Sequence, residues 1–355
     1  MTTVITCAAV NESMRSTVTG GLLLDIPGAV LVRHDIDPDA GILRRVIADG
    51  NGVIDDRSIP LAHACLGCAL REDIIPAIRE VLMRRPEVIV LALPLSAEPV
   101  PALRALAELA EEGMCKVGRV VAAVDGEEVM WDLCGDDLLS ERDLGFGADD
   151  DRALGEVLAR QIECADVVVT AGPVAQAEET VLRHMHPGGA APVPVCELQA
   201  SSLLDPLPQE EVEHRGDPLV AAPSGVADAH GVWTVELSSW RPCHPDRLRE
   251  NFEGLGGTPG RGRGVFWLPT RPEAVCQFDS AGGQISIGTH MTWQEAGVDP
   301  VTRLVITGVD GDPTEAQAAF EAALLTDAEL AAGLNSWAGR PDDYDPWLGE
   351  RRDVA

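Results

Sequence analysis

The sequence predicts an α/β protein in two domains: a doubly wound, mostly parallel sheet first, and an α+β domain after it. Three observations predict this. Apolar runs rich in β-branched residues alternate with helical patterns over the first 200 residues, which is typical of buried parallel strands linked by helices. A stretch rich in Pro, acidic and small residues follows. Beyond it, strand-like runs come in succession, with helical patterns on either side.

The elements of the first domain follow from the period of their apolar residues. Continuous apolar runs suit strands that are buried on both faces, and these runs lie at residues 3–9, 28–33, 87–93, 118–125, 166–170 and 192–196. Helical patterns, several of which open after Pro, Asp or an acidic turn, lie at residues 40–48, 69–84, 99–112, 152–165 and 175–185. The acidic stretch 136–151 interrupts the alternation, so we expect a solvated loop there.

A length of 355 residues is more than one ordinary core needs. We therefore predict a first domain over residues 1–200, a linker over 201–229, a second domain over 230–330 and a tail over 331–355. Runs such as VWTVELSSW and RLVITGV predict strands of the second domain. The tail has three large aromatic residues but no period, and it reads equally as an ordered wrap or a disordered end.

Charge and composition exclude several classes of protein. A net charge of −31 repels phosphate backbones, so a broad nucleic-acid-binding surface is not expected. The acidity serves solubility in the simpler explanation, and it would also suit a basic protein partner. No apolar run is long enough to span a membrane. The N-terminus lacks the features of a signal peptide and the nine cysteines are irregularly spaced, so we expect a cytoplasmic protein with reduced thiols.

The segment after the first strand lacks the residues that bind nucleotide phosphates. A phosphate-binding loop needs glycines, a lysine for the β- and γ-phosphates and Ser or Thr for magnesium. The matching place, TCAAVNESMRST from Thr6 to Thr17, has no glycine in the turn and no lysine. Lys116 is the only lysine, and it lies far along the chain. Because Ser13 also lacks a G-x-S-x-G elbow and no local motif supplies a catalytic triad, we expect no enzyme here.

Cys65 and Cys68 form a C-x-x-C motif ahead of a predicted helix, and this motif can present two thiolates to one zinc ion. Since a stable zinc site needs about four ligands, His63 is the nearest further candidate. Cys7, Cys115 or Glu98 could approach through the fold. The pair could also be a redox pair or pack in the core, and His63 could be an ordinary loop histidine.

Other polar residues allow a simple structural interpretation as well as a functional one. We expect the isolated cysteines 134, 164, 196, 243 and 276 to be small buried hydrophobes. His184 and His186 could share a metal but are expected to be solvated, and His244 to cap a helix. The arginines at 261, 263 and 271 form a basic island, which suits either a phosphate or acidic partner or pairing with local carboxylates.

Several segments resemble CobW-like metallochaperone GTPases, in the same order along the chain. ACLGCALREDI at 64–74 is similar to the metal-binding CxCC segment of that family and its following Thr-Leu-Arg-x-Asp-Leu, with Gly67 at the middle cysteine. RQIECADV at 160–167 resembles the Arg-Gln-Ile-x-x-Ala-Asp signature. RPCHPDRL at 241–248 and GRGVFWL at 262–268 are similar to the CobW C-terminal domain. The resemblance implies a P-loop-type first domain and a CobW C-terminal second domain.

The departures from the family fall on its nucleotide-binding parts. The switch segment Glu-Thr-Thr-Gly-Leu-Ala-Asp-Pro falls on ALPLSAEP at 92–99, and the base-reading Asn-Lys-x-Asp falls on AGPV at 171–174. Ser16 and Thr17 are the nearest counterparts of the magnesium-binding hydroxyls. The resemblance therefore implies a degenerate P-loop, with zinc as the cofactor and GTP binding not expected.

The chain lacks these motifs but retains a C-x-x-C. In this combination it resembles the zinc-responsive subgroup of the family, which recruits a hibernation factor to the ribosome. The implied function is a non-hydrolysing adaptor that acts under zinc limitation, with the ribosome or a hibernation factor as its partner. The alternatives are a zinc metallochaperone GTPase with weak nucleotide binding, and an enzyme of cobalamin metabolism.

Overall fold

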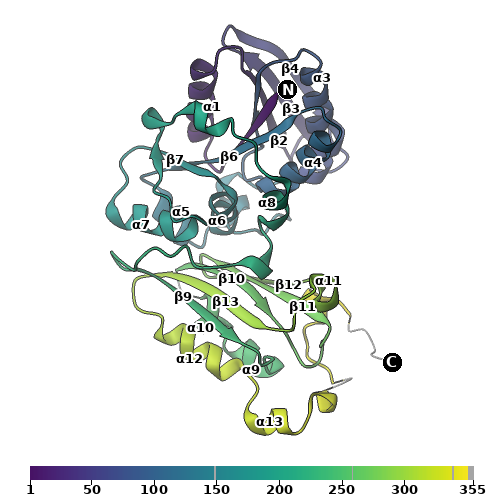
Figure 1. Ribbon diagram of the computed structural model, residues 1–355, viewed down its shortest axis with the longest axis vertical. Helices are drawn as coiled ribbons and strands as arrows, with labels where there is room; N and C mark the ends of the chain where they lie inside the picture. The colour runs from purple at the N-terminus through teal and green to yellow at the C-terminus, as the bar shows by residue number, and fades with distance from the viewer. Residues whose placement is uncertain (148, 258, 338–339, 351–355) are drawn as a thin grey trace. The chain divides into compact units, whose positions relative to one another are not determined.

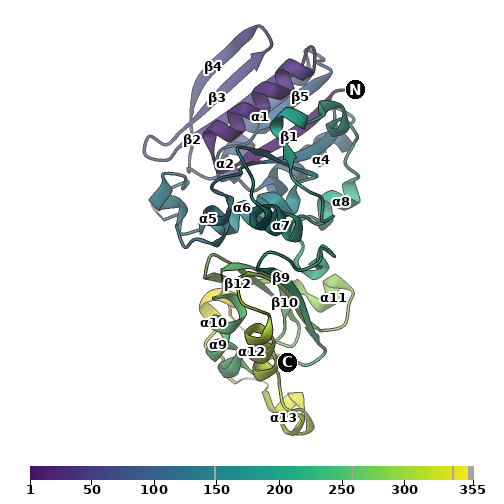
Figure 2. The same ribbon diagram turned by 90° about the vertical axis from the view of Figure 1, so that its left-hand side faces the viewer.

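The computed structural model describes residues 1–147, 149–257, 259–337 and 340–350. The chain forms two compact units, the first over residues 1–133 and 137–216, the second over 134–136 and from 217 onward. Figure 1 and Figure 2 show the path of the chain through each unit. Within the described residues, no helix combines the length and the apolar character needed to cross a membrane.

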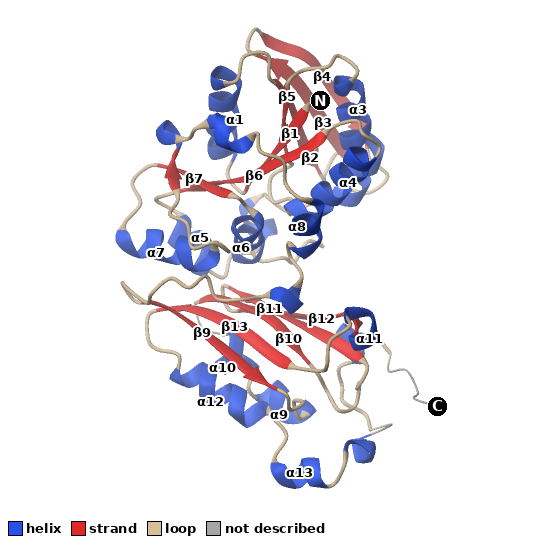
Figure 3. Cartoon of the chain, in the orientation of Figure 1, coloured by secondary structure: helices blue, strands red, loops and turns tan. Residues whose placement is uncertain are grey.

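The first unit is built on a mixed sheet whose order is β4-β3-β2-β5-β1-β6-β7-β8. The six strands from β2 to β8 run parallel, whereas β3 and β4 add an antiparallel hairpin at one edge. Figure 3 shows these strands in red. Their bounds are β1 (Thr3–Ala9), β2 (Val30–Asp37), β3 (Ile42–Asp49), β4 (Gly52–Pro60), β5 (Val88–Ala92), β6 (Lys116–Asp125), β7 (Val167–Ala171) and β8 (Val193–Pro194).

Helices cover both faces of this sheet, so the predicted doubly wound α/β fold is confirmed. Helix α1 packs on one face with Ile5, Cys7 and Ala9 of β1, while α3 and α4 pack on the other with Val4 and Ala8. The helices are α1 (Glu12–Asp25), α2 (Leu66–Ala69), α3 (Ile75–Leu82), α4 (Pro99–Glu111), α5 (Val129–Cys134), α6 (Leu154–Cys164), α7 (Gln176–Met185) and α8 (Gln209–His214). A π-helical turn, Leu70–Ile74, joins α2 to α3.

The helix expected over residues 40–48 is wrong, because this segment is strand β3. Leu43 and Ile47 are buried, and a spacing of four fits both a helical turn and every second position of a strand. Asp49 pairs with Gly52 across a two-residue turn, Gly50 and Asn51, which closes the β3–β4 hairpin. The turn residues Gly and Asn between two strands were the signal for this hairpin.

The predicted linker and the predicted solvated loop are both partly packed on the first unit. Leu207 and Val212, within the predicted linker 201–229, are buried in its core. In the acidic stretch 136–151, Leu139 is buried, and the Ser96 hydroxyl donates to the carbonyl of Leu144. Acidic side chains along a loop therefore do not prevent its few apolar residues from docking.

The second unit is an antiparallel five-stranded sheet with the order β12-β11-β10-β13-β9, which confirms the predicted α+β domain. Its strands are β9 (Val232–Ser239), β10 (Gly260–Phe266), β11 (Ala274–Ala281), β12 (Gln284–Thr292) and β13 (Thr302–Val309). Its helices are α9 (Pro245–Glu250), α10 (Phe252–Gly256), α11 (Trp293–Ala296), α12 (Thr314–Ala323), α13 (Asp327–Ala331) and α14 (Asp345–Leu348).

The described part of the tail is an ordered wrap. Tyr344 and Leu348 are buried in the core of the second unit. The Tyr344 hydroxyl donates to the carbonyl of Pro245, and the Arg271 guanidinium bonds to Asp342. Because these contacts join residues far apart in sequence, no local period announces them.

Candidate functional site

The turn from β1 to α1 holds the position of a phosphate-binding loop, and a side chain already caps it. Only Val10 and Asn11 separate the two elements. The Asn11 side chain accepts a hydrogen bond of 3.1 Å from the amide of Met14, and its carbonyl accepts from the amide of Arg15. Phosphates need such first-turn amides to be free. The Asn11 side chain caps one of them, the amide of Met14, whereas the bond from Arg15 is the first regular bond of the helix, and Glu12 adds a carboxylate to the same turn.

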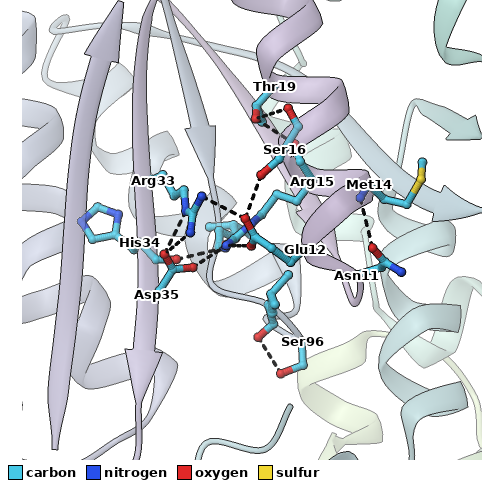
Figure 4. A network of polar contacts seen from close by, with 12 residues as sticks. Asn11, Glu12, Met14, Arg15, Ser16, Thr19, Arg33, His34, Asp35 and Ser96 are labelled. Carbon is cyan, nitrogen blue, oxygen red and sulfur yellow. Dashed lines mark hydrogen bonds and ion pairs between the residues drawn. The ribbon is translucent and has the colours of Figure 1, made fainter. Parts of the chain in front are cut away.

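Arg15 extends its side chain from α1 toward Arg33 and Asp35 of β2, as Figure 4 shows. Its side chain is 1% exposed. The guanidinium donates to the carbonyls of His34 at 3.1 Å and Leu93 at 2.8 Å, and it pairs with Glu12 and Asp35. Arginine is always charged, and its planar fork holds several acceptors at once. It thereby ties α1 to β2 and to the end of β5.

Two carboxylates complete the network around Arg15. Arg33 on β2 pairs with Glu12 at 2.9 Å and with Asp35 at 2.7 Å. Burial alone would raise the pKa of Asp35, but the charge of Arg15 and the hydrogen bonds from Arg33 and Arg15 outweigh burial and hold this pKa below its ordinary value. Asp35 therefore stays ionised and repels any phosphate that approaches.

Of the hydroxyls predicted near this site, that of Ser13 is on an exposed residue, whereas the other three are engaged or buried. Ser16 donates to Glu12 at 2.7 Å, and Thr17 donates to the carbonyl of Ser13 at 2.7 Å. Thr6 is fully buried within β1, and its hydroxyl has no hydrogen-bond partner among the described residues. None of these three hydroxyls is presented as a free magnesium ligand.

The other two nucleotide-binding positions also carry no polar side chain of the required kind. In the segment 92–99, Ser96 is buried with a φ of 58°, a left-handed conformation that a non-glycine residue adopts at some cost. Gly172 turns the chain directly after β7 with a φ of 79°. Ala92 and Val174 stand where the family has the switch glutamate and the base-reading aspartate, so neither of these two positions carries a carboxylate.

Cys65 and Cys68 lie in one helical turn at the opening of α2. Cys65 is exposed and is the N-cap, with its sulfur accepting from the amide of Cys68 at 3.4 Å. Cys68 is buried, and the Arg71 guanidinium donates to its sulfur at 3.4 Å. Cys65 also lines a cleft of 660 Å³ whose walls include Glu98, Phe146 and Arg152.

The structure does not gather a complete zinc site around this pair. Within residues 1–147, 149–257, 259–337 and 340–350, no three His, Cys, Asp or Glu side chains are arranged to hold a metal ion. His63 is exposed, and its ring bonds to the carbonyl of Ala62. Glu98 lines the same cleft as Cys65 but pairs with Arg160 at 2.9 Å. A zinc ion at Cys65 and Cys68 would draw its remaining ligands from loop movement, water or a partner.

Cys7 and Cys115 are poor candidates to complete the site. Burial raises the pKa of the Cys7 thiol to about 12 and that of Cys115 to about 11. Zinc binds the thiolate. Both thiols lie in the hydrophobic core of the sheet, so these cysteines serve packing.

A buried ion-pair chain joins the cysteine segment to the Arg15 network. Asp73, in the π-helical turn that follows the C-x-x-C, bonds His34 at 2.9 Å and Arg45 at 2.8 Å. His34 is the residue whose carbonyl accepts from Arg15. Burial lowers the pKa of His34, although the hydrogen bond to Asp73 acts in the opposite direction. The two candidate sites are thus linked through one fully buried histidine.

Sequence reasoning missed Arg15, Asp35 and Asp73, although one signal was present. In the phosphate-loop motif the lysine directly precedes the Ser or Thr, and Arg15 directly precedes Ser16. The network therefore has an arginine where the motif has its lysine. Apart from Glu12, the partners of Arg15 lie on β2 and directly after β5, so only the tertiary fold reveals them.

Several simpler readings also change. His184 and His186 are buried, so their predicted solvation is wrong. Of the five cysteines expected to be buried, Cys196 is exposed and Cys134 is only partly buried. His244 does cap α9, as its ring accepts from the amide of Asp246. In the basic island, Arg261 pairs with Asp279 and Arg271 with Asp342, which favours local pairing.

Comparison with known proteins assigns the two units to domain families. Residues 34–186 match the CobW/HypB/UreG nucleotide-binding domain, and residues 232–324 match the cobalamin synthesis protein cobW C-terminal domain. A zinc chaperone of Mycobacterium tuberculosis is 28% identical over 372 residues, covering 92% of this chain and 89% of that protein. Zinc-regulated GTPase metalloprotein activator 1 of Dictyostelium discoideum is 21% identical, covering 79% of this chain and 68% of that protein.

Among solved structures, the Zn(II)-bound YjiA GTPase from E. coli aligns over 91% of this chain and 99% of that chain, with 13% identity and a TM-score of 0.35. The chain combines a domain of the CobW/HypB/UreG nucleotide-binding family with a cobW C-terminal domain. The resemblance is confirmed at the level of these two domains. Loss of nucleotide binding and membership of the hibernation-factor subgroup stay predictions.

Proposed function

We propose that this chain is a zinc-responsive CobW-type protein that does not hydrolyse GTP and acts through protein contacts in the cytoplasm. The observation that carries the proposal is the Arg15 network. Asn11, Glu12 and Arg15 occupy the place where amides, lysine and magnesium would hold the phosphates. The match to the nucleotide-binding domain begins at residue 34, after this segment, which also supports the proposal.

Phosphoryl transfer rests on positioned amides, a cation and magnesium around the γ-phosphate. At this site the cation is buried in pairs with Glu12 and Asp35, and Ser16 is bonded to Glu12. An incoming phosphate would have to displace these carboxylates from Arg15 without gaining a glycine-lined nest. Phosphate binding would therefore break the buried ion pairs of Arg15 and form few new hydrogen bonds in their place.

We expect titration calorimetry with GTP and magnesium to show no binding tighter than about millimolar, which corresponds to roughly 4 kcal/mol. Arg15→Lys, which restores the residue type of the motif, should bind no better, because the turn still lacks glycines. Micromolar affinity in the unsubstituted protein would contradict the proposal. Micromolar affinity in Arg15→Lys alone would show that the arginine, and not the turn, closes the site.

Zinc enters the proposal through Cys65 and Cys68. Two thiols in one turn, one of them exposed beside a cleft, can take up a zinc ion without unfolding the sheet. The names of two relatives, a zinc chaperone and a zinc-regulated GTPase metalloprotein activator, support zinc as the metal. Because the described residues gather no third ligand, occupancy would respond to the zinc supply.

The purified chain should take up about one equivalent of zinc with release of thiol protons. Zinc content would be measured by elemental analysis after gel filtration. Cys65→Ser with Cys68→Ser should reduce uptake to background. The matched control is Cys196→Ser, which removes an exposed thiol outside the motif and should leave uptake unchanged. Equal zinc content in all three proteins would place the metal elsewhere.

The partner in this proposal is the ribosome or a hibernation factor, as the family resemblance implies. The Cys65–Cys68 turn continues directly into the π-helical turn that carries Asp73. Filling the thiols would reorder this turn, and such a local change can expose or hide a partner surface.

A second candidate function is a zinc chaperone driven by nucleotide. It is favoured by the match to a nucleotide-binding domain family and by the relative named as a zinc-regulated GTPase metalloprotein activator. The calorimetric titration separates the two candidates, since a nucleotide-driven chaperone needs micromolar affinity at working concentrations.

A further inference from the structure

We propose that Cys65 and Cys68 form a peroxide-sensitive dithiol whose disulfide form cannot hold zinc. This inference extends the proposed function, since it assigns a regulation to the same pair of thiols. It rests on the contrast between these two cysteines and the other cysteines of the chain, and on the cleft that leads to one of them.

Six of the nine cysteines are poor candidates for reaction with peroxide because their thiols are wholly or partly buried. Burial raises the pKa of each of these thiols to about 11 or about 12, which suppresses the reactive thiolate at neutral pH; they are Cys7, Cys115, Cys134, Cys164, Cys243 and Cys276. Cys196 is exposed but isolated in sequence. Only the pair at 65 and 68 combines an exposed sulfur with a second thiol three residues away.

The two thiols are placed for an intramolecular disulfide. Residues three apart in a helical turn lie about 5–6 Å apart between Cβ atoms, whereas a disulfide needs Cβ atoms about 3.5–4.5 Å apart. Cys65 is the extended N-cap residue, so it must move toward Cys68 by about 1–2 Å. The sulfur of Cys65 accepts from the amide of Cys68 at 3.4 Å. A modest shift of the N-cap residue would therefore bring the two sulfurs together, with the rest of α2 in place.

The difference in exposure indicates which cysteine reacts with the oxidant first and which one then closes the disulfide. Cys65 lines the 660 Å³ cleft and meets a reagent first, whereas Cys68 is buried and bonded to Arg71. Glu98, Asp149 and Asp150 line the cleft beside Arg152, which pairs with Asp150 at 2.8 Å, so the remaining excess of carboxylates disfavours anionic disulfides such as oxidised glutathione. Hydrogen peroxide is small and uncharged, and it is the class of oxidant that this entrance admits.

The reaction balances with peroxide alone. The Cys65 thiolate attacks one peroxide oxygen, the O–O bond breaks and hydroxide leaves, so that Cys65 becomes a sulfenic acid. The Cys68 sulfur then attacks the Cys65 sulfur, the S–S bond forms, and water leaves with the proton of Cys68. Two thiols lose two electrons and one peroxide becomes two waters. Since both sulfurs are then bonded to each other, neither is a thiolate ligand for zinc.

The test uses the full chain, in zinc-free and zinc-loaded forms, treated with hydrogen peroxide and then alkylated. Trypsin releases both cysteines in one peptide, residues 58–71. Mass spectrometry should find this peptide two hydrogens lighter and unalkylated, with full recovery after dithiothreitol. The zinc-loaded chain should react at least about tenfold more slowly, and it should release one zinc per disulfide formed.

Three variants sharpen the result. Cys68→Ser should leave a sulfenic acid at Cys65 that dimedone traps, Cys65→Ser should leave Cys68 unoxidised, and Cys196→Ser should behave as the unsubstituted chain. Peroxide that oxidises Cys196 while both pair thiols stay alkylatable would overturn the inference. If the disulfide forms but the chain never binds zinc, the peroxide-sensitive dithiol is supported and the proposed zinc function is contradicted. If the chain binds zinc but forms no disulfide, the zinc function is supported and the dithiol is contradicted.

Discussion

Replacing Arg15 by alanine should destabilise the first unit by about 3 kcal/mol. The buried guanidinium donates to the carbonyls of His34 and Leu93, and a buried acceptor left without a donor costs about 1–3 kcal/mol. Amide hydrogen exchange of peptides from β1 and α1 reports this unit separately from the second one. We expect their slowest exchange rates to rise about a hundredfold, since every 1.4 kcal/mol is a factor of ten.

Arg33→Ala is the matched control for this prediction. Arg33 pairs with the same two carboxylates, Glu12 and Asp35, but its side chain is 27% exposed and donates to neither carbonyl. A partly exposed ion pair contributes about 1 kcal/mol or less. Equal acceleration in both variants would show that charge balance around Asp35, and not the buried fork of Arg15, holds α1 against β2.

The second large effect concerns recruitment. In zinc-starved cells, Cys65→Ser with Cys68→Ser should abolish the zinc-dependent change in loading of a hibernation factor onto ribosomes. Ser16→Ala with Thr17→Ala should leave loading unchanged, because these hydroxyls bond within α1 to Glu12 and to the carbonyl of Ser13. The factor would be measured in ribosome pellets, beside the amount of folded chain in each strain.

Cys196→Ser again serves as the thiol control, and it should load the factor normally. The reverse pattern, in which the Ser16 and Thr17 changes abolish loading in a folded protein while the cysteine changes do nothing, would favour the nucleotide-driven chaperone. Loss of loading in every variant, including Cys196→Ser, would point to a defect in abundance rather than in either site.

The hairpin at residues 42–60 shows where local reasoning stopped. Leu43 and Ile47 satisfy a helix and a strand alike, and pairing with β2 over Val30–Asp37 decides between them. The C-x-x-C could be predicted because its spacing is local in the sequence. The residues that surround it in the fold could not be predicted in this way. Glu98 reaches the cleft of Cys65 only through the fold, and there it is held by Arg160.

The sequence by itself determined the alternation of buried strands and helices, the α+β second domain, the missing glycines and lysine after β1, and the pair Cys65 and Cys68. These are properties of residue type and short spacing, which the chain carries locally. Only the tertiary structure decided that Arg15 is buried against the carbonyls of His34 and Leu93, and that Asp73 links it to the cysteine turn through His34. A buried charge takes its partners from strands and turns far away in sequence, and no period along the chain encodes which of them will meet.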